Sequence, residues 1–455
     1  MGSCAWLSAL FALQLACQAP ALLSTRPLQD ARSLETSSAR LIHTVVPSEC
    51  SEYQDWQVLG QFWSWKKIGS PGMFTRIACC EMGKLKGQNI VNPYQVYYTN
   101  TNVDPEGIED NYIPYNKPYG VMSWLQDVKP AGDYFLIVDP DMTFHRSFTV
   151  DELKAGPGWG AAQHMWSRSL LQEEEEAVNM LGEEEARLPL ADEVGEVYLN
   201  AAEDLTRIAP LWWNYTKQMR VFHETYAKEL PKDTPLERPW IAEMYGIALG
   251  AAQLGVHHHG YHNLVMHPPG VQGALNQEGP NMVVSHYAWN AEVPSFSWKW
   301  NKHAFKNWSA LSCPPWNLDQ QFSREAWGEQ YNGSTGGLFP HPPYPSELTN
   351  QAPADLFQDL ANIEMVGMLN EGFCELHHKV YCPPSEELIR ECGKATRVMQ
   401  ELVQYYQRLA NGSSIFCLDT NPQHCAQVQQ ASNKKEDADE ASEKEVLFVQ
   451  DCMHA

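Results

Sequence analysis

Basic side chains are scarce in this sequence of 455 residues. Lys and Arg number 32 against 56 Asp and Glu, which gives a formal net charge of −24 at pH 7. Nucleic acids and anionic membrane surfaces are bound through clustered Lys and Arg, so we expect neither as a partner of the folded chain. The acidic runs 173–176, 183–185 and 436–445 supply much of the excess. They are typical of solvated loops and disordered tails, with a surface that attracts a basic polypeptide as the alternative.

Long apolar runs are missing beyond the N-terminus, where no stretch approaches the roughly 18 residues of a membrane-spanning helix. Residues 5–17 are mostly apolar, and Ala19-Pro20-Ala21 offers a small-x-small cleavage pattern. We predict a signal peptide over residues 1–21, with an uncleaved signal anchor as the alternative and the only membrane contact. A polar stem follows over residues 22–39. The body is then expected in the lumen of the secretory pathway (endoplasmic reticulum or Golgi), or secreted.

The familiar phosphate and hydrolase motifs are absent. No G-x-x-x-x-G-K-[ST], G-x-G-x-x-G or G-x-S-x-G occurs, which removes P-loop, dinucleotide and serine-hydrolase interpretations. A diphosphate would have to be held by a metal together with basic groups. Arg76 and Lys117 are the available candidates, although a single basic residue is more often a surface charge.

Cysteine usage agrees with a lumenal location. Without the predicted signal, ten cysteines remain: Cys50, Cys79, Cys80, Cys313, Cys374, Cys382, Cys392, Cys417, Cys425 and Cys452. An even number in a secreted chain favours disulfides, whose pairing the sequence does not give. CELHHKVYC (374–382) and CLDTNPQHC (417–425) share one cysteine separation. They predict disulfides across a helical hairpin, with zinc at 374–382 as the alternative.

The order of elements predicts an α/β domain with a mostly parallel sheet. The expected strands are 41–46, ending at Pro47, 71–81 and 133–140, and the expected helices are 51–69, 120–128, 201–219 and 239–256. Residues 167–200 are expected as an acidic, helical surface segment. The Gly- and Pro-rich stretch 332–348 closes a catalytic domain over 40–348. A helical, cysteine-bearing extension (351–428) and a disordered charged tail (429–455) follow.

The strand FLIV (135–138) runs into Asp139 and Asp141. It lacks polar alternation, as expected of an interior strand, and ligands bind at the carboxyl ends of such strands. Two carboxylates two residues apart suit Mg²⁺ or Mn²⁺, although Asp-Pro-Asp is also a good turn. The apolar run before His286 offers a third ligand, or only a histidine that caps a strand.

Two further segments carry chemistry-bearing side chains. Glu243 lies in an apolar helix beside Trp240 and Tyr245, where apolar surroundings would raise its pKa and suit it to proton transfer. The alternative is that Glu243 lies on the solvent-exposed face of the helix. HHHGYH (257–262) is interpreted as a polar loop, because three adjacent histidines cannot all face one metal. A zinc hydrolase built on this cluster is the alternative.

Eight ordered blocks together resemble the plant and algal peptidyl serine α-galactosyltransferases and the related hydroxyproline O-arabinosyltransferases. The blocks lie within residues 40–348 and read IHTVVPSECSEYQDWQ, PGMFTRIACCE, NKPYGVMSWLQ, YFLIVDPDMTF, DLTRIAPLWWNYT, RPWIAEMYGIALGAA, VVSHYAW and LFPHPPYP. The resemblance implies a GT-A type fold, a Rossmann-like mixed sheet flanked by helices. It also implies a UDP-sugar donor, Mn²⁺ (or Mg²⁺) and retention of the donor's anomeric configuration. The acceptor would be serine or hydroxyproline in a hydroxyproline-rich glycoprotein.

The resemblance also assigns roles. It implies that Asp139, Asp141 and His286 bind the metal and that Glu243 lies near the acceptor, where we expect it to be the catalytic residue. The donor side would include Thr44, Arg76, Asn116 and Lys117, and the acceptor side Trp240 and Tyr245.

The family pattern leaves the sugar open. Galactosyltransferase members usually have Asp-Ala-Asp and arabinosyltransferases commonly Glu-Pro-Asp, where this chain has Asp-Pro-Asp. Pro140 therefore favours the arabinosyltransferases, whereas the long blocks favour the galactosyltransferases. A non-catalytic lumenal protein that binds glycopeptides through its tryptophans is the further alternative.

Overall fold

The computed structural model describes residues 40–81, 94–103, 105, 107–108, 110–165, 191–226, 239–267, 282–288, 290–306, 308, 338–348, 353–379 and 382–410. The predicted signal and stem, the three acidic runs and the charged tail lie outside these residues. Within them, no helix has both the length and the apolar character needed to cross a bilayer.

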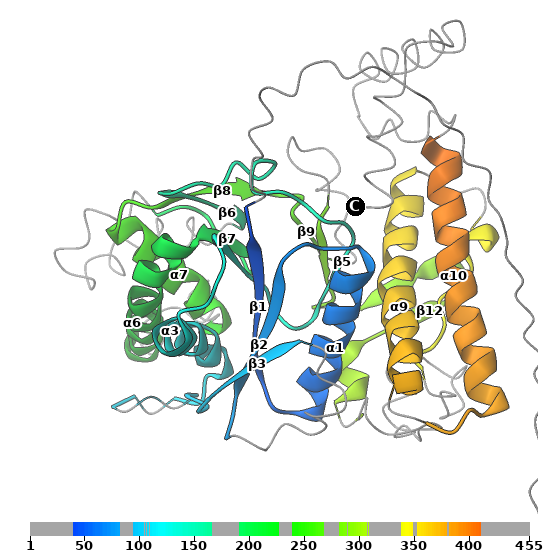
Figure 1. Ribbon diagram of the computed structural model, residues 1–455, viewed down its shortest axis with the longest axis horizontal. Coiled ribbons are helices and arrows are strands. Elements are labelled where there is room, and N and C mark those ends of the chain that lie inside the picture. Colours follow the sequence, from blue (N-terminus) through cyan, green and yellow to red (C-terminus); the bar gives the residue numbers. More distant parts are fainter. Residues whose placement is uncertain are drawn as a thin grey trace, which may run out of the picture. The chain divides into compact units, whose positions relative to one another are not determined.

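A mixed sheet of seven strands forms the centre of the described structure, in the order β3-β2-β1-β4-β7-β6-β8 (Figure 1). The strands are β1 (Ile42–Glu49), β2 (Met73–Cys79), β3 (Gln95–Thr99), β4 (Tyr134–Ile137), β6 (Trp159–Gln163), β7 (Tyr198–Ala201) and β8 (His257–Tyr261). Neighbouring strands are parallel except that β7 runs antiparallel to both β4 and β6. The predicted α/β class with a mostly parallel sheet is therefore confirmed.

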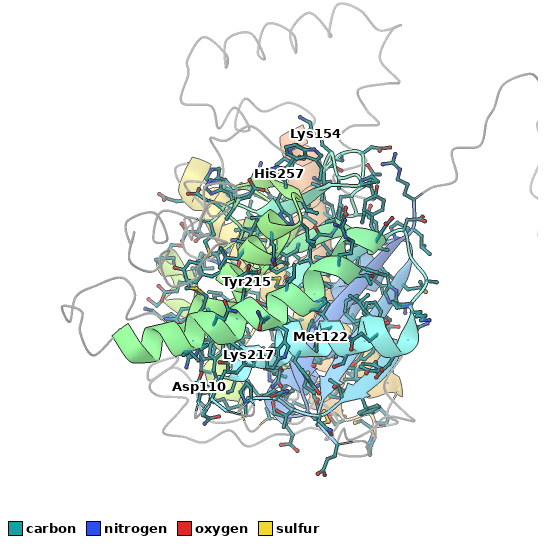
Figure 2. All side chains as sticks on the ribbon, turned by 90° about the vertical axis from the view of Figure 1, so that its left-hand side faces the viewer. Asp110, Met122, Lys154, Tyr215, Lys217 and His257 are labelled. Atoms are coloured by element: carbon teal, nitrogen blue, oxygen red, sulfur yellow. A yellow bond between two sulfur atoms is a disulfide. The ribbon has the colours of Figure 1, made fainter. Side chains whose placement is uncertain are left out.

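Helices cover both faces of this sheet. One face carries α3 (Asn116–Val128), α6 (Ala202–Tyr226) and α7 (Ala242–Gln253), and the other carries α1 (Glu52–Lys67) (Figure 1). Beyond α1 lie α9 (Pro353–Lys379) and α10 (Glu386–Ala410). Figure 2 looks onto the first face, where Tyr215 and Lys217 mark α6 and Met122 marks α3. Each face has its own buried cluster, with Trp124 and Trp212 in one and Phe62 and Phe144 in the other.

Smaller elements complete the fold. A second sheet has the order β5-β10-β9, and β11 pairs with β12. Their bounds are β5 (Met142–Phe144), β9 (Val265–Met266), β10 (Val284–His286), β11 (Ala291–Val293) and β12 (Trp298–Trp300). Short 3₁₀ helices are η1 (Ile113–Tyr115), η4 (Pro239–Ile241), η6 (Pro294–Phe296), η7 (Lys302–Phe305) and η9 (Pro345–Glu347).

The prediction that the first strand ends at Pro47 is wrong, because β1 continues to Glu49 and Pro47 pairs with Ile77 of β2. The Val45 carbonyl accepts a hydrogen bond from Val138 on the β4 side, and the pairing with β4 ends there. Since alternate residues of a strand point their amides the same way, the missing N–H of Pro47 faces the side that β4 has left. Proline is tolerated in a strand at such a position.

Two segments predicted without strands form strands of the main sheet. Residues 198–201 were expected within an acidic surface helix but form β7, because the short apolar run pairs between β4 and β6. Residues 257–261 were expected as a polar loop but form β8, parallel to β6. The period of two buries His258 against Asn200 and turns its two histidine neighbours outward beside Trp159.

The C-terminal helix α9 packs against both α10 and α1. Trp56 and Leu59 of α1 share one buried cluster with Met365, Leu369 and Phe373 of α9. A disulfide joins the two helices of the α9–α10 hairpin, as expected, but it links Cys374 to Cys392. The prediction rested on segments 374–382 and 417–425, and the second of these lies outside the described residues. Cys382 is disulfide-bonded as well, so the sulfurs of the CELHHKVYC segment are not available as zinc ligands.

Candidate metal and donor site

Asp139 and Asp141 lie where the chain passes from the main sheet to the second sheet. β4 ends at Ile137 and β5 begins at Met142, so both aspartates follow the carboxyl end of an interior strand, as predicted. Gln61 of α1 donates a side-chain hydrogen bond to the Asp139 carbonyl at 2.7 Å. The Tyr287 amide donates to the Asp141 carbonyl at 3.1 Å. The backbone of the motif is therefore held from two sides.

The pairing of β10 with β5 brings His286 opposite Met142 and hence beside Asp141. His286 Nε2 lies 3.1 Å from Asp141 Oδ2, and Lys302 Nζ contacts the same carboxylate oxygen. Burial alone would raise the pKa of Asp141, but His286 and Lys302 outweigh it and hold that pKa well below its ordinary value. Two of the predicted metal ligands are thus brought together.

Asp139 faces a different cation. Lys117, at the start of α3, places Nζ 2.7 Å from Asp139 Oδ1 and donates to the Glu196 carbonyl at 3.0 Å. Burial raises the pKa of Asp139, Lys117 opposes the rise, and the nearby negative charge of Asp141 adds to it. The side chain of Lys117 therefore points into the site, as the donor-binding prediction requires.

A second group of possible ligands adjoins His286. Among the described residues, the ligand atoms of Glu196, His267 and His286 lie within 4.8 Å of one another. Glu196 Oε1 lies 3.1 Å from His286 Nδ1, on the opposite side of the ring from Asp141. Burial disfavours the ionised form of Glu196, but His286 and His267 overcome it and lower the pKa to about 2.

The predicted catalytic residue Glu243 is buried at the start of α7. Its carboxylate accepts a hydrogen bond from the Tyr112 hydroxyl, and its carbonyl accepts one from Trp212 Nε1 at 2.6 Å. Burial raises the pKa of Glu243 to about 7, although Lys117 opposes the rise. A carboxyl with a pKa near neutrality is suited to accept or return a proton.

Trp240 and Tyr245 lie on either side of Glu243 in the chain but differ in exposure. The Trp240 side chain is 63% exposed, and its carbonyl accepts from the Tyr112 hydroxyl that also contacts Glu243. The Trp240 ring therefore lies at the surface, next to the ring of Tyr112. Tyr245 is 2% exposed and packs in an apolar cluster with Tyr112 and Tyr115, so the structure places it behind this surface.

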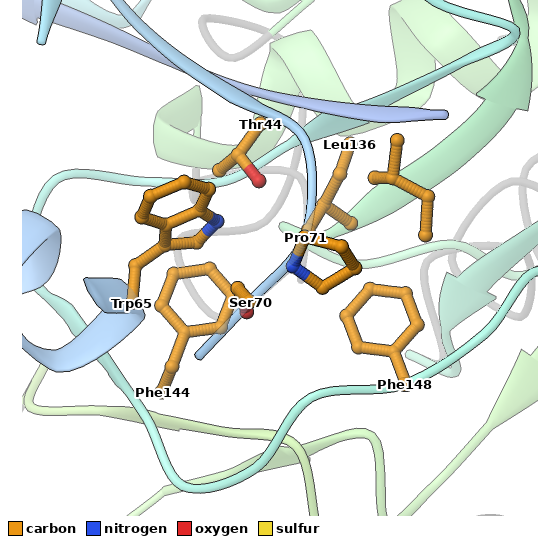
Figure 3. A pocket seen from close by; sticks show the side chains of 8 residues that line it. Thr44, Trp65, Ser70, Pro71, Leu136, Phe144 and Phe148 are labelled. Carbon is orange, nitrogen blue, oxygen red and sulfur yellow. The ribbon is translucent and has the colours of Figure 1, made fainter. Parts of the chain in front are cut away.

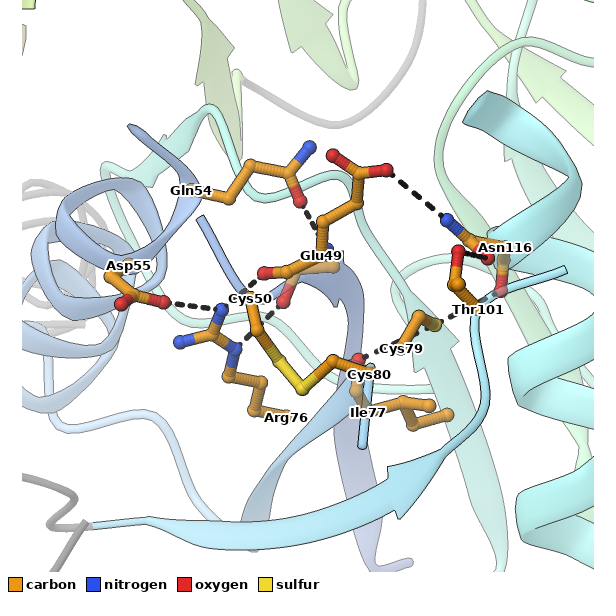
Figure 4. Close-up of a disulfide and its surroundings, with 11 residues drawn as sticks. Glu49, Cys50, Gln54, Asp55, Arg76, Ile77, Cys79, Cys80, Thr101 and Asn116 are labelled. Carbon is orange, nitrogen blue, oxygen red and sulfur yellow. Dashed lines mark hydrogen bonds and ion pairs between the residues drawn. A yellow bond between two sulfur atoms is a disulfide. The ribbon is translucent and has the colours of Figure 1, made fainter. Parts of the chain in front are cut away.

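Arg76 is fully buried beside the Cys50–Cys80 disulfide (Figure 4). Its guanidinium pairs with Asp55 at 2.7 Å and donates to the Ser48 hydroxyl and the Glu49 carbonyl. An anionic donor would compete with these partners, so the observed contacts tie β1, β2 and α1 together. The structure does not bring Arg76 to Asp139 and Asp141.

Asn116 and Thr44 also lie apart from the carboxylates. Asn116 Oδ1 accepts from the Asn102 amide at 2.8 Å, and its amide group faces Glu49 (Figure 4). Thr44 lies in the middle of β1, opposite Leu136, and lines a small apolar pocket with Trp65 (Figure 3). Leu136 lies three residues before Asp139 in the chain. Thr44, which pairs with Leu136, therefore lies within the sheet and not at the carboxyl edge that carries the site.

The donor set fits a divalent cation of the hard or borderline type. Asp139, Asp141 and His286 supply carboxylate oxygen and imidazole nitrogen, the ligands that Mn²⁺ accepts. In this cluster the carboxylates of Asp139, Asp141, Glu196 and Glu243 outnumber the ammonium groups of Lys117 and Lys302. Burial would lower the pKa of His286, but Asp141 and Glu196 raise it to about 10, so a protonated His286 supplies the further positive charge that a bound cation would replace.

Three residues of the cluster were not predicted: Glu196, His267 and Lys302. Glu196 follows the acidic segment, whose composition indicates a solvated surface rather than a buried site. Lys302 follows the aromatic segment that contains β12 and is one of several lysines there. The one available signal is Glu196 itself, a carboxylate directly before an apolar, β-forming run.

Residues 42–260 match the model of the Hydroxyproline O-arabinosyltransferase family N-terminal domain. The chain is 28% identical to a peptidyl serine alpha-galactosyltransferase of Chlamydomonas reinhardtii, over 84% of this chain and 51% of that protein. It is 30% identical to one of Arabidopsis thaliana, over 78% and 40%. A hydroxyproline O-arabinosyltransferase of Medicago truncatula, RDN2, is 26% identical over 57% and 68%. The chain thus spans about half the length, or less, of the two galactosyltransferases.

A solved structure of the galactosyltransferase LgtC with donor and acceptor sugar analogues is 13% identical, covers 55% of this chain and 88% of that chain, and has a TM-score of 0.34. The resemblance inferred from the eight sequence blocks is confirmed by these sequence matches. By these matches, the chain is similar to the peptidyl serine α-galactosyltransferases and the hydroxyproline O-arabinosyltransferases.

Proposed function

We propose that this chain is a GT-A type glycosyltransferase that moves a sugar from a UDP-sugar to a serine or hydroxyproline hydroxyl of a hydroxyproline-rich glycoprotein, with retention of configuration. The observation that carries the proposal is the meeting of Asp141 and His286 at the carboxyl edge of the sheet, 3.1 Å apart. The relatives named above act, by their names, on peptidyl serine or on hydroxyproline.

Asp139, Asp141 and His286 would hold Mn²⁺ or Mg²⁺. When bound, the cation neutralises the diphosphate and makes UDP a better leaving group. Lys117 and Lys302, which contact the two aspartates in this structure, are placed to pair with phosphate oxygens once the aspartates bind the cation. Glu243 orients the acceptor hydroxyl or takes its proton, and Trp240 offers a stacking surface at the rim.

The secretory lumen is the proposed compartment. The Cys50–Cys80 and Cys374–Cys392 disulfides support it, because such bonds persist where the surroundings are oxidising. Serine is favoured as the acceptor because the galactosyltransferase matches cover 84% and 78% of the chain, against 57% for the arabinosyltransferase RDN2. Pro140 supports the second candidate, an arabinosyltransferase that acts on hydroxyproline.

The test incubates the full chain with a panel of UDP-sugars and with serine- or hydroxyproline-containing peptides, with and without Mn²⁺, and weighs the products. We expect one sugar to be transferred only with the metal. Asp141→Asn should remain folded and lose the Mn²⁺ stimulation. Asp151→Asn, which alters an 81% exposed carboxylate paired with Arg40, should behave as wild type. Full activity of Asp141→Asn would contradict the metal assignment.

UDP binding separates an enzyme from a glycopeptide-binding protein. The affinity for UDP should rise with Mn²⁺, because a cation held by Asp139, Asp141 and His286 would offset the negative charge of the diphosphate. A protein that only binds glycopeptides through aromatic side chains would bind the peptide but show no metal-dependent affinity for UDP.

A further inference from the structure

We propose that Glu196 is a positioning residue that fixes the ring of His286, so that its Nε2 atom faces the cation site beside Asp141. The inference rests on the proposed function, because it requires that Asp141 and His286 share a cation. Glu196 lies in the segment before β7, which comes from a different part of the chain than either ligand.

Glu196 is held at three points. Its amide donates to Gln163 Oε1 at 3.0 Å, and its carbonyl accepts from Lys117 Nζ at 3.0 Å. Its carboxylate oxygen Oε1 lies 3.1 Å from His286 Nδ1. The residue is 6% exposed. The backbone of Glu196 is thus held on both sides, and its buried carboxylate is directed at the imidazole ring.

Gln163 determines which hydrogen bonds the neighbouring histidine can make. Because its Oε1 accepts from the Glu196 amide, its Nε2 must donate to His267 Nε2, which lies 2.7 Å away. His267 Nε2 is therefore an acceptor and cannot donate to Glu196 Oε2, although the two atoms are 3.6 Å apart. The hydrogen bond of the Glu196 carboxylate is therefore made with His286 Nδ1.

The backbone beside Glu196 is shaped for this contact. Gly195 lies so close to Gln163 that an added Cβ would be 2.4 Å from Gln163 Oε1. The Gly195 amide also donates to the Gln163 carbonyl at 2.8 Å. The absence of a side chain at Gly195 lets Gln163 reach the Glu196 amide. The hydrogen bonds that run from Gln163 through Glu196 to His286 therefore depend on glycine at position 195.

The contact of Glu196 with Nδ1 of His286 decides which ring nitrogen is available to a metal. A neutral imidazole that offers Nε2 to a cation carries its proton on Nδ1, and a carboxylate hydrogen-bonded to Nδ1 stabilises that tautomer and that ring orientation. Without Glu196, His286 could turn or carry its proton on Nε2. Loss of such a partner typically weakens metal affinity by about 10- to 100-fold.

The experiment measures Mn²⁺ on the full chain, in the presence of UDP, by pulsed electron paramagnetic resonance and by titration. Wild type should show the coupling of a histidine nitrogen to Mn²⁺, and His286→Ala should lack it. Glu196→Ala should lose the coupling and bind Mn²⁺ about 10- to 100-fold more weakly. If Glu196→Ala does not fold, Glu196→Met fills the same volume without a hydrogen-bond acceptor and should give the same result.

Glu193→Ala is the matched control, since it removes a carboxylate of the same segment that pairs with His164 instead. It should keep both the coupling and the affinity. A folded Glu196 variant that retains the nitrogen coupling overturns the inference. Wild type that binds Mn²⁺ without a histidine coupling overturns it as well and leaves an aspartate-bound metal standing. Wild type that binds no Mn²⁺ overturns the inference together with the metal part of the proposed function.

Discussion

Lys117 Nζ and Asp139 Oδ1 form an ion pair of 2.7 Å at the carboxyl edge of the main sheet, where both side chains are largely buried. The pair joins the first turn of α3 to the segment that follows β4 and contains Asp139 and Asp141. A buried ion pair contributes little by itself, but removing one partner leaves the other charge uncompensated.

Lys117→Met should therefore lower the free energy of unfolding by about 3 kcal/mol. Mn²⁺ should restore part of this loss, because a cation bound to Asp139 replaces the missing positive charge. Thermal unfolding with and without Mn²⁺ measures both effects, and the metal-induced rise in Tm should be larger in the variant than in wild type. Lys66→Met, which breaks the half-exposed pair with Glu375, should cost less than about 1 kcal/mol and show no such difference.

Glu243→Gln should stabilise the fold at alkaline pH. Burial raises the pKa of Glu243 to about 7 from 4.5, so the folded state holds this proton more tightly than the unfolded state does. The cost of ionisation in the folded protein appears as pH rises above the unfolded value and is complete above pH of about 7. The variant should match wild type near pH 4.5 and exceed it by about 3 kcal/mol near pH 8. Denaturant unfolding at the two pH values measures this difference.

The same variant should lose transferase activity, because an amide cannot accept the acceptor proton. Unchanged activity would remove Glu243 from the proposed mechanism. An equal change of stability at both pH values would contradict the raised pKa.

Gly246→Ala should destabilise the packing of α7 on α6. An added Cβ would lie 2.3 Å from the Thr216 hydroxyl oxygen and 2.8 Å from the Trp212 carbonyl oxygen, and the backbone of α6 cannot move away at low cost. We expect a loss of about 2 kcal/mol by chemical denaturation, together with reduced transferase activity, since Glu243 lies one turn away. Gly393→Ala in α10 meets no atom within 4 Å and should instead add about 0.5 to 1 kcal/mol. Equal effects of the two substitutions would argue against the close approach.

Replacing both Cys374 and Cys392 by serine should lower stability by about 2 to 4 kcal/mol, because the disulfide closes a loop of 18 residues in the unfolded chain. Guanidinium unfolding of the double variant measures the loss. Reducing agent should lower wild-type stability further than that of the variant. A variant as stable as wild type would mean that the packing of α9 on α10 and on α1 holds the hairpin without the disulfide.

The sequence predicted the part of the site that lies at the end of one strand. An uninterrupted apolar run before Asp139 indicates an interior strand, and the carboxyl end of such a strand is where ligands bind, so the two aspartates could be found without a structure. Lys117 and His286 could be proposed as partners by residue type. The pairing of β10 with β5, which brings His286 to Asp141, depends on long-range register that no local pattern encodes.

The remaining contacts depend on packing between distant segments. Arg76 was predicted near the donor because it is basic and precedes the motif, but burial beside Asp55 gives it a partner within the fold. Glu196 was overlooked because local composition reports average solvation, whereas its position is decided by where β7 inserts between β4 and β6. His258 contacts Asn200 for the same reason. The pairing of residues 257–261 with β6 turns this polar segment into a half-buried strand.

The packing of α9 on α1 has a consequence for the order in which this protein folds. Gln61 of α1 holds the Asp139 carbonyl, and α1 is covered on its outer side by residues of α9 such as Leu369 and Phe373. Synthesis proceeds from the N-terminus, so the strands and the aspartates leave the ribosome long before the helix that covers α1. Until α9 arrives, the aromatic side chains of α1 remain open to water and to chaperones. Each new molecule therefore completes its candidate active site only after α9 has been synthesised.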